Sequence, residues 1–462
     1  MRDLSALIKA YDVRGIVPDQ WGPPLARDAG VAFVEVLGIR SQDGGEGQIV
    51  VGHDMRPTGP DLVAAFIDGV TSAGVNVINI GLCSTDGLYF ASGRLNLPGA
   101  MFTASHNPAE YNGIKLCRAG AAPVGQDSGL SKIRELLESE ELPSFDGTPG
   151  TATFQDMLVD YSEYLRHLVP LNDIRPLKVV IDTGNGMGGF TVPAVLGNQI
   201  LPELPLEIDA MYFELDGSFP NHEANPIDPE NLRDLQKRVL EVGADIGLAF
   251  DGDADRCFVV DEQGAIVDPS TLTALIATRE LAKEPGSIII HNLITSRSVP
   301  EIITESGGTP VRTRVGHSFI KATMAETGAI FGGEHSGHFY FRDFWKADSG
   351  MLAAMHALAA LGETEPGTKL SDLLSPFIRY IPSGEINTTV ADAIVVMERI
   401  KVAYQDSDVD IDMLDGLTVA GSNWWFNVRP SNTEPLLRLN AEAATIAEME
   451  SLRDAVLELM NS

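Results

Sequence analysis

Residues 48–54, with the sequence Gln48-Ile49-Val50-Val51-Gly52-His53-Asp54, begin the pattern that decides the fold. This apolar run leads through a polar turn into a helical pattern over residues 60–72, and a second strand pattern follows over residues 75–81. Short, nearly all-apolar strands that alternate with helices are typical of βαβ units, in which a mostly parallel sheet is covered on both faces. We therefore predict an α/β domain in this part of the chain.

The same cycle of strand, polar turn and helix occurs twice more. Residues 178–182 form an apolar run that enters a glycine-rich turn at 183–189, and residues 287–292 precede a helical pattern at 299–305. The cycles are about one small domain apart, which predicts three α/β domains of similar plan with mixed, mostly parallel sheets.

The pattern changes beyond residue 375. Strand-like runs at 378–381 and 385–390 are followed by helical patterns at 391–402 and 446–460. This order predicts a smaller C-terminal α+β domain with a different topology.

Three segments divide the chain. Residues 138–150 are acidic and rich in proline and glycine, as in a linker, residues 261–264 predict a hairpin turn, and residues 363–367 predict a further connection. The expected domains cover residues 1–149, 150–262, 263–372 and 373–462.

The charge of the chain is strongly unbalanced. Its 462 residues include 33 lysines and arginines against 65 aspartates and glutamates, a formal net charge of −32. Such a charge repels phosphates at long range, so it argues against nonspecific binding to nucleic acid or to an anionic membrane. A phosphate ester as substrate would need a local basic pocket on this acidic protein.

Cysteine usage and the N-terminal sequence bear on the compartment. Cys83, Cys117 and Cys257 have no paired spacing, so we expect buried thiols in a reducing environment. The first 15 residues lack the apolar segment of a signal peptide, and no apolar run is long enough to span a membrane. These features predict a cytoplasmic protein.

The first segment whose side chains could take part in a reaction is Thr103-Ala104-Ser105-His106-Asn107-Pro108. Its Asn-Pro pair marks a turn, which predicts that Ser105 lies on an exposed loop. A loop serine beside His106, ten residues before Lys115, is a candidate nucleophile or phosphate carrier. The alternative is a polar turn that only satisfies its own backbone.

The strongest motif is Asp251-Gly252-Asp253-Ala254-Asp255-Arg256, which follows a strand-like run. Three carboxylates at alternate positions can surround one hard cation, either Mg²⁺ or Ca²⁺. The alternative is a solvated acidic turn. We favour a Mg²⁺ site at Asp251, Asp253 and Asp255, because Arg256 beside them suits a phosphate held near the metal.

A glycine-rich loop, residues 332–338, carries Glu334, Ser336 and His338. A carboxylate with a neighbouring hydroxyl suits the binding of sugar hydroxyls, and histidine can move protons near neutral pH. The alternatives are surface polarity or a zinc pair of His335 and His338, for which no third ligand stands at a recognisable spacing.

A second polar turn lies at residues 429–435 in the C-terminal domain. It offers a guanidinium, two hydroxyls and an amide, which are donors that would hold a phosphate dianion. A plain polar turn has the same composition. The candidate donors are Arg429, Ser431, Asn432 and Thr433. Two weaker segments, around Arg14 and His317, would be structural if each is taken alone.

Seven segments in this order resemble the α-D-phosphohexomutase superfamily, specifically its bacterial phosphomannomutase/phosphoglucomutase branch. The resemblance covers essentially the whole chain. The segments that carry it are Tyr-Asp-Val-Arg-Gly (11–15), Thr-Ala-Ser-His-Asn-Pro (103–108), Asn-Gly-Ile-Lys (112–115), Asp-Gly-Asp-Ala-Asp-Arg (251–256), Gly-His-Ser (316–318), Gly-Glu-His-Ser-Gly-His (333–338) and Arg-Pro-Ser-Asn-Thr-Glu-Pro (429–435).

The resemblance implies four domains around a central cleft and the interconversion of hexose 1-phosphate and hexose 6-phosphate. Ser105 would be carried as phosphoserine, and Asp251, Asp253, Asp255 and a phosphoserine oxygen would hold Mg²⁺. A hexose 1,6-bisphosphate would be the intermediate and the activator, and it would reorient between two phosphoryl transfers. The resemblance also implies sugar contacts from Glu334 and Ser336, and phosphate contacts from Arg429, Ser431, Asn432 and Thr433. The residues expected to supply charge and proton transfer are Arg14, His106, Lys115, Arg256, His317 and His338.

Two departures from the family pattern concern specificity. Leu293 stands about where the bacterial dual-specificity enzymes have a lysine that contacts phosphate, and Arg297 is a candidate to compensate. His335 replaces a methionine of the best-known members. We expect mannose phosphates as substrates, with glucose phosphates as the alternative, and a monomer or weak homodimer. The competing functions are a metal-dependent sugar phosphatase and a non-catalytic sugar-phosphate sensor.

Overall fold

The computed structural model describes residues 3–9, 11–40, 47–430 and 436–462, apart from the side chains of residues 317 and 318. The chain forms two compact units. The first contains Met1–Val267 and Ser336–Ser371, and the second contains Asp268–His335 and Asp372–Ser462.

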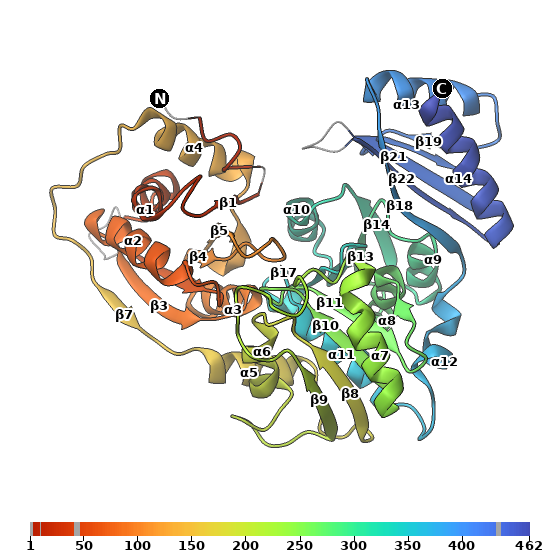
Figure 1. The fold of residues 1–462 in the computed structure, drawn as a ribbon, viewed down its shortest axis with the longest axis horizontal. Helices are drawn as coiled ribbons and strands as arrows, with labels where there is room; N and C mark the ends of the chain where they lie inside the picture. The colour runs from red at the N-terminus through yellow and green to blue at the C-terminus, as the bar shows by residue number, and fades with distance from the viewer. Residues whose placement is uncertain (1–2, 10, 41–46, 431–435) are drawn as a thin grey trace. The chain divides into compact units, whose positions relative to one another are not determined.

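The N-terminal sheet of the first unit has the strand order β1-β5-β4-β2-β3-β7, with β6 paired to β5. Figure 1 labels β1, β3, β4, β5 and β7 of this sheet. Its strands are β1 (Val13–Ile16), β2 (Gln48–His53), β3 (Asn76–Leu82), β4 (Gly99–Phe102), β5 (Tyr111–Arg118), β6 (Ala122–Pro123) and β7 (Ala152–Phe154). The helices are α1 (Pro23–Leu37), α2 (Gly59–Ser72), α3 (Thr85–Leu95) and α4 (Leu130–Ser139). Helices α1 and α2 pack closely against each other, because Gly30 and Gly69 face backbone carbonyls of the opposite helix.

Strand β2 decides where the functional loops of this sheet lie. It pairs in parallel with both β3 and β4, so the carboxyl ends of the three strands meet at one edge. In open α/β sheets, ligands bind outside this edge. The apolar residues of the strands are buried against the helices, and Phe66 of α2 packs edge-on against Phe102 at the end of β4.

A second sheet of the first unit has the order β12-β11-β10-β8-β9. Strands β8, β9 and β10 are parallel, while β10, β11 and β12 are antiparallel neighbours. Its elements are α5 (Leu158–Leu168), β8 (Leu177–Asp182), α6 (Gly188–Val195), β9 (Leu206–Met211), α7 (Arg233–Val242), β10 (Ile246–Phe250), β11 (Cys257–Asp261) and β12 (Ile266–Val267). Residues 336–371 of the same unit add a hairpin of β16 (Phe339–Phe341) and β17 (Ala347–Asp348), then the fully buried helix α11 (Gly350–Gly362).

The second unit combines a parallel sheet with an antiparallel one. In the first, β13 (Ile288–Asn292) lies between β14 (Thr309–Thr313) and β15 (Phe331–Gly333). The second has the order β18-β22-β21-β20-β19 and only antiparallel pairs. The remaining elements are α8 (Pro269–Lys283), α9 (Ser298–Glu305), α10 (His317–Thr327), β18 (Ile381–Thr389), α13 (Ala393–Tyr404), β19 (Asp410–Asp412), β20 (Leu417–Ala420), β21 (Trp424–Pro430), β22 (Leu436–Ala443) and α14 (Ile446–Asn461).

Most of the expected elements are confirmed within a few residues, and so are the mixed sheets and the hairpin turn at 261–264. The three cysteines are buried and form no disulfide, as expected. The strand expected at 378–381 is wrong. The short helix α12 (Leu370–Leu374) and a 3₁₀ turn at Ser375–Phe377 occupy the preceding residues, so the strand starts only at Ile381. In the part of the chain that the structure describes, no helix combines the length and apolar character that a membrane span requires.

Candidate active site

Ser105 follows β4 at the carboxyl edge of the first sheet, and it is buried rather than exposed. Only 4% of the residue is accessible, so the expected exposed loop is wrong. Its backbone has φ of 50°, a left-handed conformation that costs a non-glycine residue free energy unless the surroundings impose it. The Thr103 hydroxyl accepts a hydrogen bond from the Ser105 N–H at 2.9 Å and helps to fix this conformation.

Arg56, which the sequence analysis missed, explains how the serine loop is held. Its buried guanidinium donates hydrogen bonds to the carbonyl oxygens of Ser105 (3.0 Å) and Asn107 (2.6 Å). It also reaches the carbonyls of Pro108 (2.7 Å) and Tyr111 (2.8 Å). The Arg56 side chain therefore supplies the hydrogen-bond donors that these four backbone carbonyls need. Its four hydrogen bonds hold the loop around Ser105 in place.

The aspartate loop lies directly against the serine loop. It forms a turn between the antiparallel strands β10 and β11, in which Ala254 has φ of 60°. A side chain at Gly252 would come within 2.4 Å of the Ser105 carbonyl oxygen, so only glycine allows this approach. The ligand atoms of Asp251, Asp253 and Asp255 lie within 4.8 Å of one another, and all three residues are buried.

Two cations neutralise these carboxylates. Lys115 Nζ donates to Asp253 Oδ2 at 2.7 Å and to Asp255 Oδ2 at 2.6 Å. Arg256 Nε donates to Asp251 Oδ2 at 2.8 Å, and its Nη2 donates to Ser105 Oγ at 3.1 Å. Together with Ser105, these two cations and three aspartates form what we call the transfer centre.

Ser105 Oγ is the meeting point of the transfer centre. It donates a hydrogen bond to Asp251 Oδ2 at 2.9 Å and lies 3.2 Å from His106 Nδ1. The same His106 nitrogen bonds to Arg256. The pKa of His106 falls to about 2, because burial and then the charges of Arg256 and Arg14 oppose protonation. His106 is therefore neutral.

The charges in this centre shift one another's ionisation. Burial lowers the pKa of Lys115, but Asp253 and Asp255 outweigh it and hold that pKa well above its ordinary value. Burial would raise the pKa of Asp253, yet Lys115 and the Thr85 hydroxyl keep it below its ordinary value. For Asp251 burial prevails, and its pKa is raised despite Arg256.

The aspartates fit a hard divalent cation. Asp253 Oδ1 and Asp255 Oδ1 are buried and accept no hydrogen bond from any described residue. Oxygen ligands of this kind suit Mg²⁺, and a bound cation would satisfy both atoms. The cluster is thus a candidate metal site, as the motif predicted.

His338 and Ser336, also in the first unit, lie beside this cluster. Ser336 Oγ is 2.9 Å from His338 Nδ1. His338 Nε2 lies 3.7 Å from Asp255 Oδ1 and 3.9 Å from Asp348 Oδ2. A backbone bridge between Arg256 and His338 ties the histidine to the aspartate loop.

Arg14 reaches the serine loop from β1. Its guanidinium donates to Asn107 Oδ1 at 2.6 Å and pairs with Asp12. The first unit therefore brings together most of the predicted site residues: Arg14, Ser105, His106, Lys115, Asp251, Asp253, Asp255, Arg256, Ser336 and His338.

The second unit holds the remaining predicted residues, of which Glu334 and Arg429, here named the sugar-side residues, have described side chains. Glu334 is buried after β15 and accepts hydrogen bonds from Gly316 N (3.1 Å) and Asn292 Nδ2 (3.4 Å). Arg429, near the end of β21, donates to Glu385 at 3.3 Å. His317 begins α10, but its side chain is outside the described part, and so are the predicted residues Ser431, Asn432 and Thr433.

Leu293 and Arg297 serve the scaffold of the second unit. Leu293 is buried in a small apolar cluster with Ile294 and Trp425. Arg297 donates to the Gly421 carbonyl at 2.8 Å and pairs with Glu301 at 3.3 Å. These contacts engage part of its guanidinium, and its role as a replacement for the family's lysine stays a prediction.

Two positioning residues in the first unit were missed at the sequence level. Thr85 Oγ1 donates to Asp253 Oδ2 at 2.6 Å, and Arg56 holds the serine loop. Both follow the carboxyl end of a parallel strand, β3 and β2 respectively. A polar residue just after the carboxyl end of a parallel strand is the sequence feature that could have identified both residues.

Four family descriptions match the chain in order. They are phosphoglucomutase/phosphomannomutase alpha/beta/alpha domain I (residues 5–144), domain II (160–264), domain III (268–380) and the C-terminal domain (385–459). A phosphohexose mutase of Xanthomonas campestris is 41% identical over 94% of both chains. The chain belongs to the phosphoglucomutase/phosphomannomutase family. It is an enzyme of that family, and the predicted plan of three α/β domains and a different C-terminal domain is confirmed.

Other relatives agree over nearly the full length. A phosphomannomutase of Vibrio cholerae is 39% identical over 96% of this chain and 95% of its own. A solved structure of a phosphoglucomutase/phosphomannomutase family protein from Burkholderia thailandensis has a TM-score of 0.86 at 30% identity. It covers 99% of this chain and 97% of that one.

Proposed function

We propose that this chain is a phosphohexomutase that interconverts hexose 1-phosphate and hexose 6-phosphate through a phosphoserine at Ser105. The observation that carries the proposal is the position of Ser105 Oγ, 2.9 Å from Asp251 and 3.1 Å from Arg256. Phosphoryl transfer needs positioning and charge neutralisation more than covalent chemistry, and the transfer centre supplies both.

Asp251, Asp253, Asp255 and Ser105 Oγ are the atoms that would hold Mg²⁺, which when bound would neutralise negative charge on the transferring phosphoryl group. The protein's own cations share this task. Arg256 donates a hydrogen bond to the oxygen that becomes the leaving group. Lys115 stays an ammonium ion because its pKa is held well above its ordinary value by Asp253 and Asp255, although burial opposes them.

We assign His338 as the base that takes the proton of the attacking sugar hydroxyl. Its Nε2 faces the carboxylates of Asp255 and Asp348, which stabilise the imidazolium formed by that transfer. His106 stays neutral and contributes only through hydrogen bonds of Nδ1, since burial holds its pKa at about 2. When its bond to phosphorus breaks, the Ser105 oxygen takes a proton from solvent, and His338 returns its proton to solvent, so the proton count is unchanged.

The proposed substrates are mannose phosphates, with glucose phosphates as the alternative. The curated name phosphomannomutase for the Vibrio cholerae relative supports mannose. Glu334 and Ser336 would bind sugar hydroxyls, and Arg429, Ser431, Asn432 and Thr433 would bind the phosphate that is not transferred. Arg14 and His317 would supply charge and proton transfer. A hexose 1,6-bisphosphate would load Ser105 and serve as activator, and the chain would act as a monomer or weak homodimer.

The test uses the purified full chain with Mg²⁺, a trace of hexose 1,6-bisphosphate and mannose 1-phosphate or glucose 1-phosphate. Formation of the 6-phosphate is followed, and intact-mass analysis locates a covalent phosphoryl group. We expect turnover and a phosphorylated Ser105 peptide in the wild type, and neither in Ser105→Ala. Ser139→Ala, on the surface of α4, is the matched serine control and should behave as wild type.

The other outcomes separate the alternatives. Sustained release of inorganic phosphate without any isomer would identify a sugar phosphatase that uses the same residues. Binding of hexose phosphate with neither product would identify a sensor. Full turnover by Ser105→Ala would contradict the phosphoserine mechanism itself.

A further inference from the structure

Asp86 is a buried carboxylate that the proposed mechanism does not use. It lies in the first turn of α3 and has no accessible surface. Its Oδ2 accepts hydrogen bonds from Tyr161 at 2.8 Å and Ser349 at 2.6 Å, and its Oδ1 accepts one from Ser84. A buried carboxylate that is paired with hydroxyls instead of a cation is costly, so its presence needs an explanation.

One of the three hydroxyls is local, and the other two come from distant parts of the first unit. Ser84 caps α3, Tyr161 belongs to α5, and Ser349 caps α11. Tyr161 is 75 positions from Asp86 in the chain, and Ser349 is 263 positions away. Asp86 therefore joins the first sheet's helix to two segments that follow it much later in the sequence.

The turn that carries Asp86 also contacts the aspartate loop. Its neighbour Thr85 donates from Oγ1 to Asp253 Oδ2 at 2.6 Å and from its backbone N–H to the Asp253 carbonyl at 3.0 Å. A shift of this turn would therefore move a ligand of the candidate metal site.

The Ser349 arm leads to His338. Asp348, the residue before Ser349, faces His338 Nε2 at 3.9 Å, and the Ser349 N–H donates to the Phe339 carbonyl at 3.0 Å. Gly350, the residue after it, lies against the backbone of the aspartate loop, since a Cβ there would come within 2.6 Å of the Arg256 carbonyl carbon. Through its two neighbours in the chain, Ser349 is thus connected both to His338 and to the backbone of the aspartate loop.

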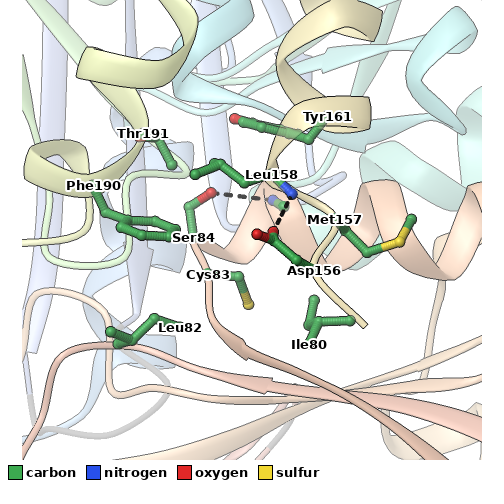
Figure 2. A pocket seen from close by; sticks show the side chains of 11 residues that line it. Ile80, Leu82, Cys83, Ser84, Asp156, Met157, Leu158, Tyr161, Phe190 and Thr191 are labelled. Atoms are coloured by element: carbon green, nitrogen blue, oxygen red, sulfur yellow. Dashed lines mark hydrogen bonds between the residues drawn. The ribbon is translucent and has the colours of Figure 1, made fainter. Parts of the chain in front are cut away.

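A ligand does not explain the cluster. Ser84 and Tyr161 line a pocket with Cys83, Met157 and Phe190 around them, as Figure 2 shows. Its free space is about 20 Å³, which holds about one water molecule. The hydroxyls around Asp86 are therefore structural connections and not parts of a small-molecule site.

We propose that Asp86 is a positioning residue for phosphoryl transfer. Its carboxylate, through Ser349, fixes the segment that carries Asp348 and His338, while Thr85 of the same turn fixes Asp253. The inference rests on the proposed function, in which His338 is the base. It states that the hydrogen bond between Asp86 and Ser349 sets the distance between His338 and the candidate metal site. A misplacement of about 1 Å in such a centre costs about a hundredfold in rate.

The test compares the two hydroxyl arms of the same oxygen. Ser349→Ala removes the arm that leads to His338, whereas Tyr161→Phe removes the arm that leads to α5, which carries none of the predicted site residues. We expect kcat to fall at least tenfold in Ser349→Ala, with KM for the hexose phosphate within threefold of wild type. Tyr161→Phe should keep kcat within twofold.

Two further variants guard against a general loss of structure. Ser349→Thr keeps both the hydroxyl and the helix cap, and it should restore kcat. Asp86→Asn should show the same kcat loss as Ser349→Ala, with a single-turnover rate of transfer from phosphorylated Ser105 that falls in parallel. Melting temperatures of all variants are measured alongside.

Equal losses of kcat in Tyr161→Phe and Ser349→Ala would overturn the inference, since the cluster would then be merely structural. An unchanged kcat in Asp86→Asn would overturn it as well. If the wild-type chain itself shows no mutase turnover and no phosphate on Ser105, the proposed function fails instead. The wild-type assay therefore distinguishes the two failures.

Discussion

The transfer centre and the sugar-side residues differ in how their charges are held. In the transfer centre, three buried carboxylates face two cations, and Lys115 binds two of the carboxylates at 2.6–2.7 Å. Of the sugar-side residues, Arg429 pairs at 3.3 Å with Glu385, a partly exposed carboxylate that Arg438 shares at 3.2 Å.

Under the proposed function, this difference would separate the residues that perform the chemistry from the residues that bind the substrate. Removing one partner of a buried, hydrogen-bonded ion pair leaves an uncompensated charge in a medium of low polarity. Preorganised charges of this kind act most strongly on the transition state. Substitutions in the transfer centre should therefore lower kcat and stability, whereas substitutions of the sugar-side residues should mainly change KM.

The largest effect is expected for Asp253→Asn. The change removes a candidate metal ligand and the partner that Lys115 and Thr85 share, so kcat should fall about 1000-fold, the upper range for loss of a preorganised electrostatic group. Steady-state kinetics at saturating Mg²⁺ measure it. Asp261→Asn is the matched control, because Asp261 is also buried but only accepts hydrogen bonds from the hairpin turn at Gln263 and Ala265. If Asp253→Asn kept a tenth or more of wild-type kcat, the claim that the buried charges of the transfer centre determine kcat would be wrong.

Lys115→Met tests whether the centre also depends on its cations for stability. The substitution leaves Asp253 and Asp255 without their shared ammonium group, and we expect a loss of about 3–5 kcal/mol in the free energy of unfolding. Urea unfolding measures the loss, and kcat should fall about 100-fold or more.

The control for this variant is Lys237→Met, which removes a lysine from an exposed pair with Glu241. Such pairs contribute about 0–1 kcal/mol, so unfolding should hardly change. Similar losses in both lysine variants would show that burial of the pair is unimportant.

The sequence predicts the individual elements of this centre well but not their burial. The strand before Asp251 and the turn after β4 follow from local patterns, and both are found where expected. Ser105 was expected to be exposed, because an Asn-Pro turn reports only on the local backbone. Its burial comes from Arg56 and Gly252, which are distant in sequence.

The same limit applies to Asp86 and Arg297. The hydrogen bond from Ser349 to Asp86 joins residues 263 positions apart. The periodicity of helices and strands relates only residues that are close in sequence, so it cannot predict this contact. Arg297 was a candidate phosphate ligand by proximity to Leu293, yet its guanidinium bonds to the Gly421 carbonyl, in a part of the chain that patterns do not connect to it. The domain boundaries at 149, 262 and 372 stay a prediction.

Asp86 provides a third test, because it is a buried carboxylate without the cation that Asp253 has. Burial raises its pKa from 3.8 to about 6, although Ser349, Ser84 and Tyr161 oppose the shift. A raised pKa means that the folded protein binds the proton more tightly, so this stabilisation is present below pH 3.8 and is lost as the pH rises through about 6.

The stability of wild type relative to Asp86→Asn should therefore decrease between pH 4 and pH 7, by at most about 3 kcal/mol at about 1.4 kcal/mol for each pKa unit. Urea unfolding of both proteins across this range measures the difference. The contribution of Asp253 to the free energy of unfolding depends on pH in the opposite direction. Lys115 lowers the pKa of Asp253 in spite of burial, so this stabilisation is present above pH 3.8 and is lost in acid. A pH-independent difference between wild type and Asp86→Asn would show that folding does not shift the pKa of Asp86.

The smallest effect is expected for Arg429→Ala, on the recognition side of the comparison. Burial lowers the pKa of Arg429, and Glu385, a carboxylate that Arg438 shares, raises it. Loss of a phosphate contact that is the same in ground state and transition state raises KM and leaves kcat unchanged. We expect KM for the hexose phosphate to rise about tenfold, or about 1.4 kcal/mol, with kcat within about threefold.

Arg438→Ala is the control for this last substitution, because Arg438 lies opposite Arg429 on β22 and pairs with the same Glu385 at 3.2 Å. It lies outside the motif at 429–435, so its KM should stay within about twofold of wild type. A kcat loss in Arg429→Ala as large as that in Asp253→Asn would mean that the second unit's cation takes part in transition-state stabilisation. Charge pairing within the folded chain would then no longer distinguish the residues that bind from the residues that react.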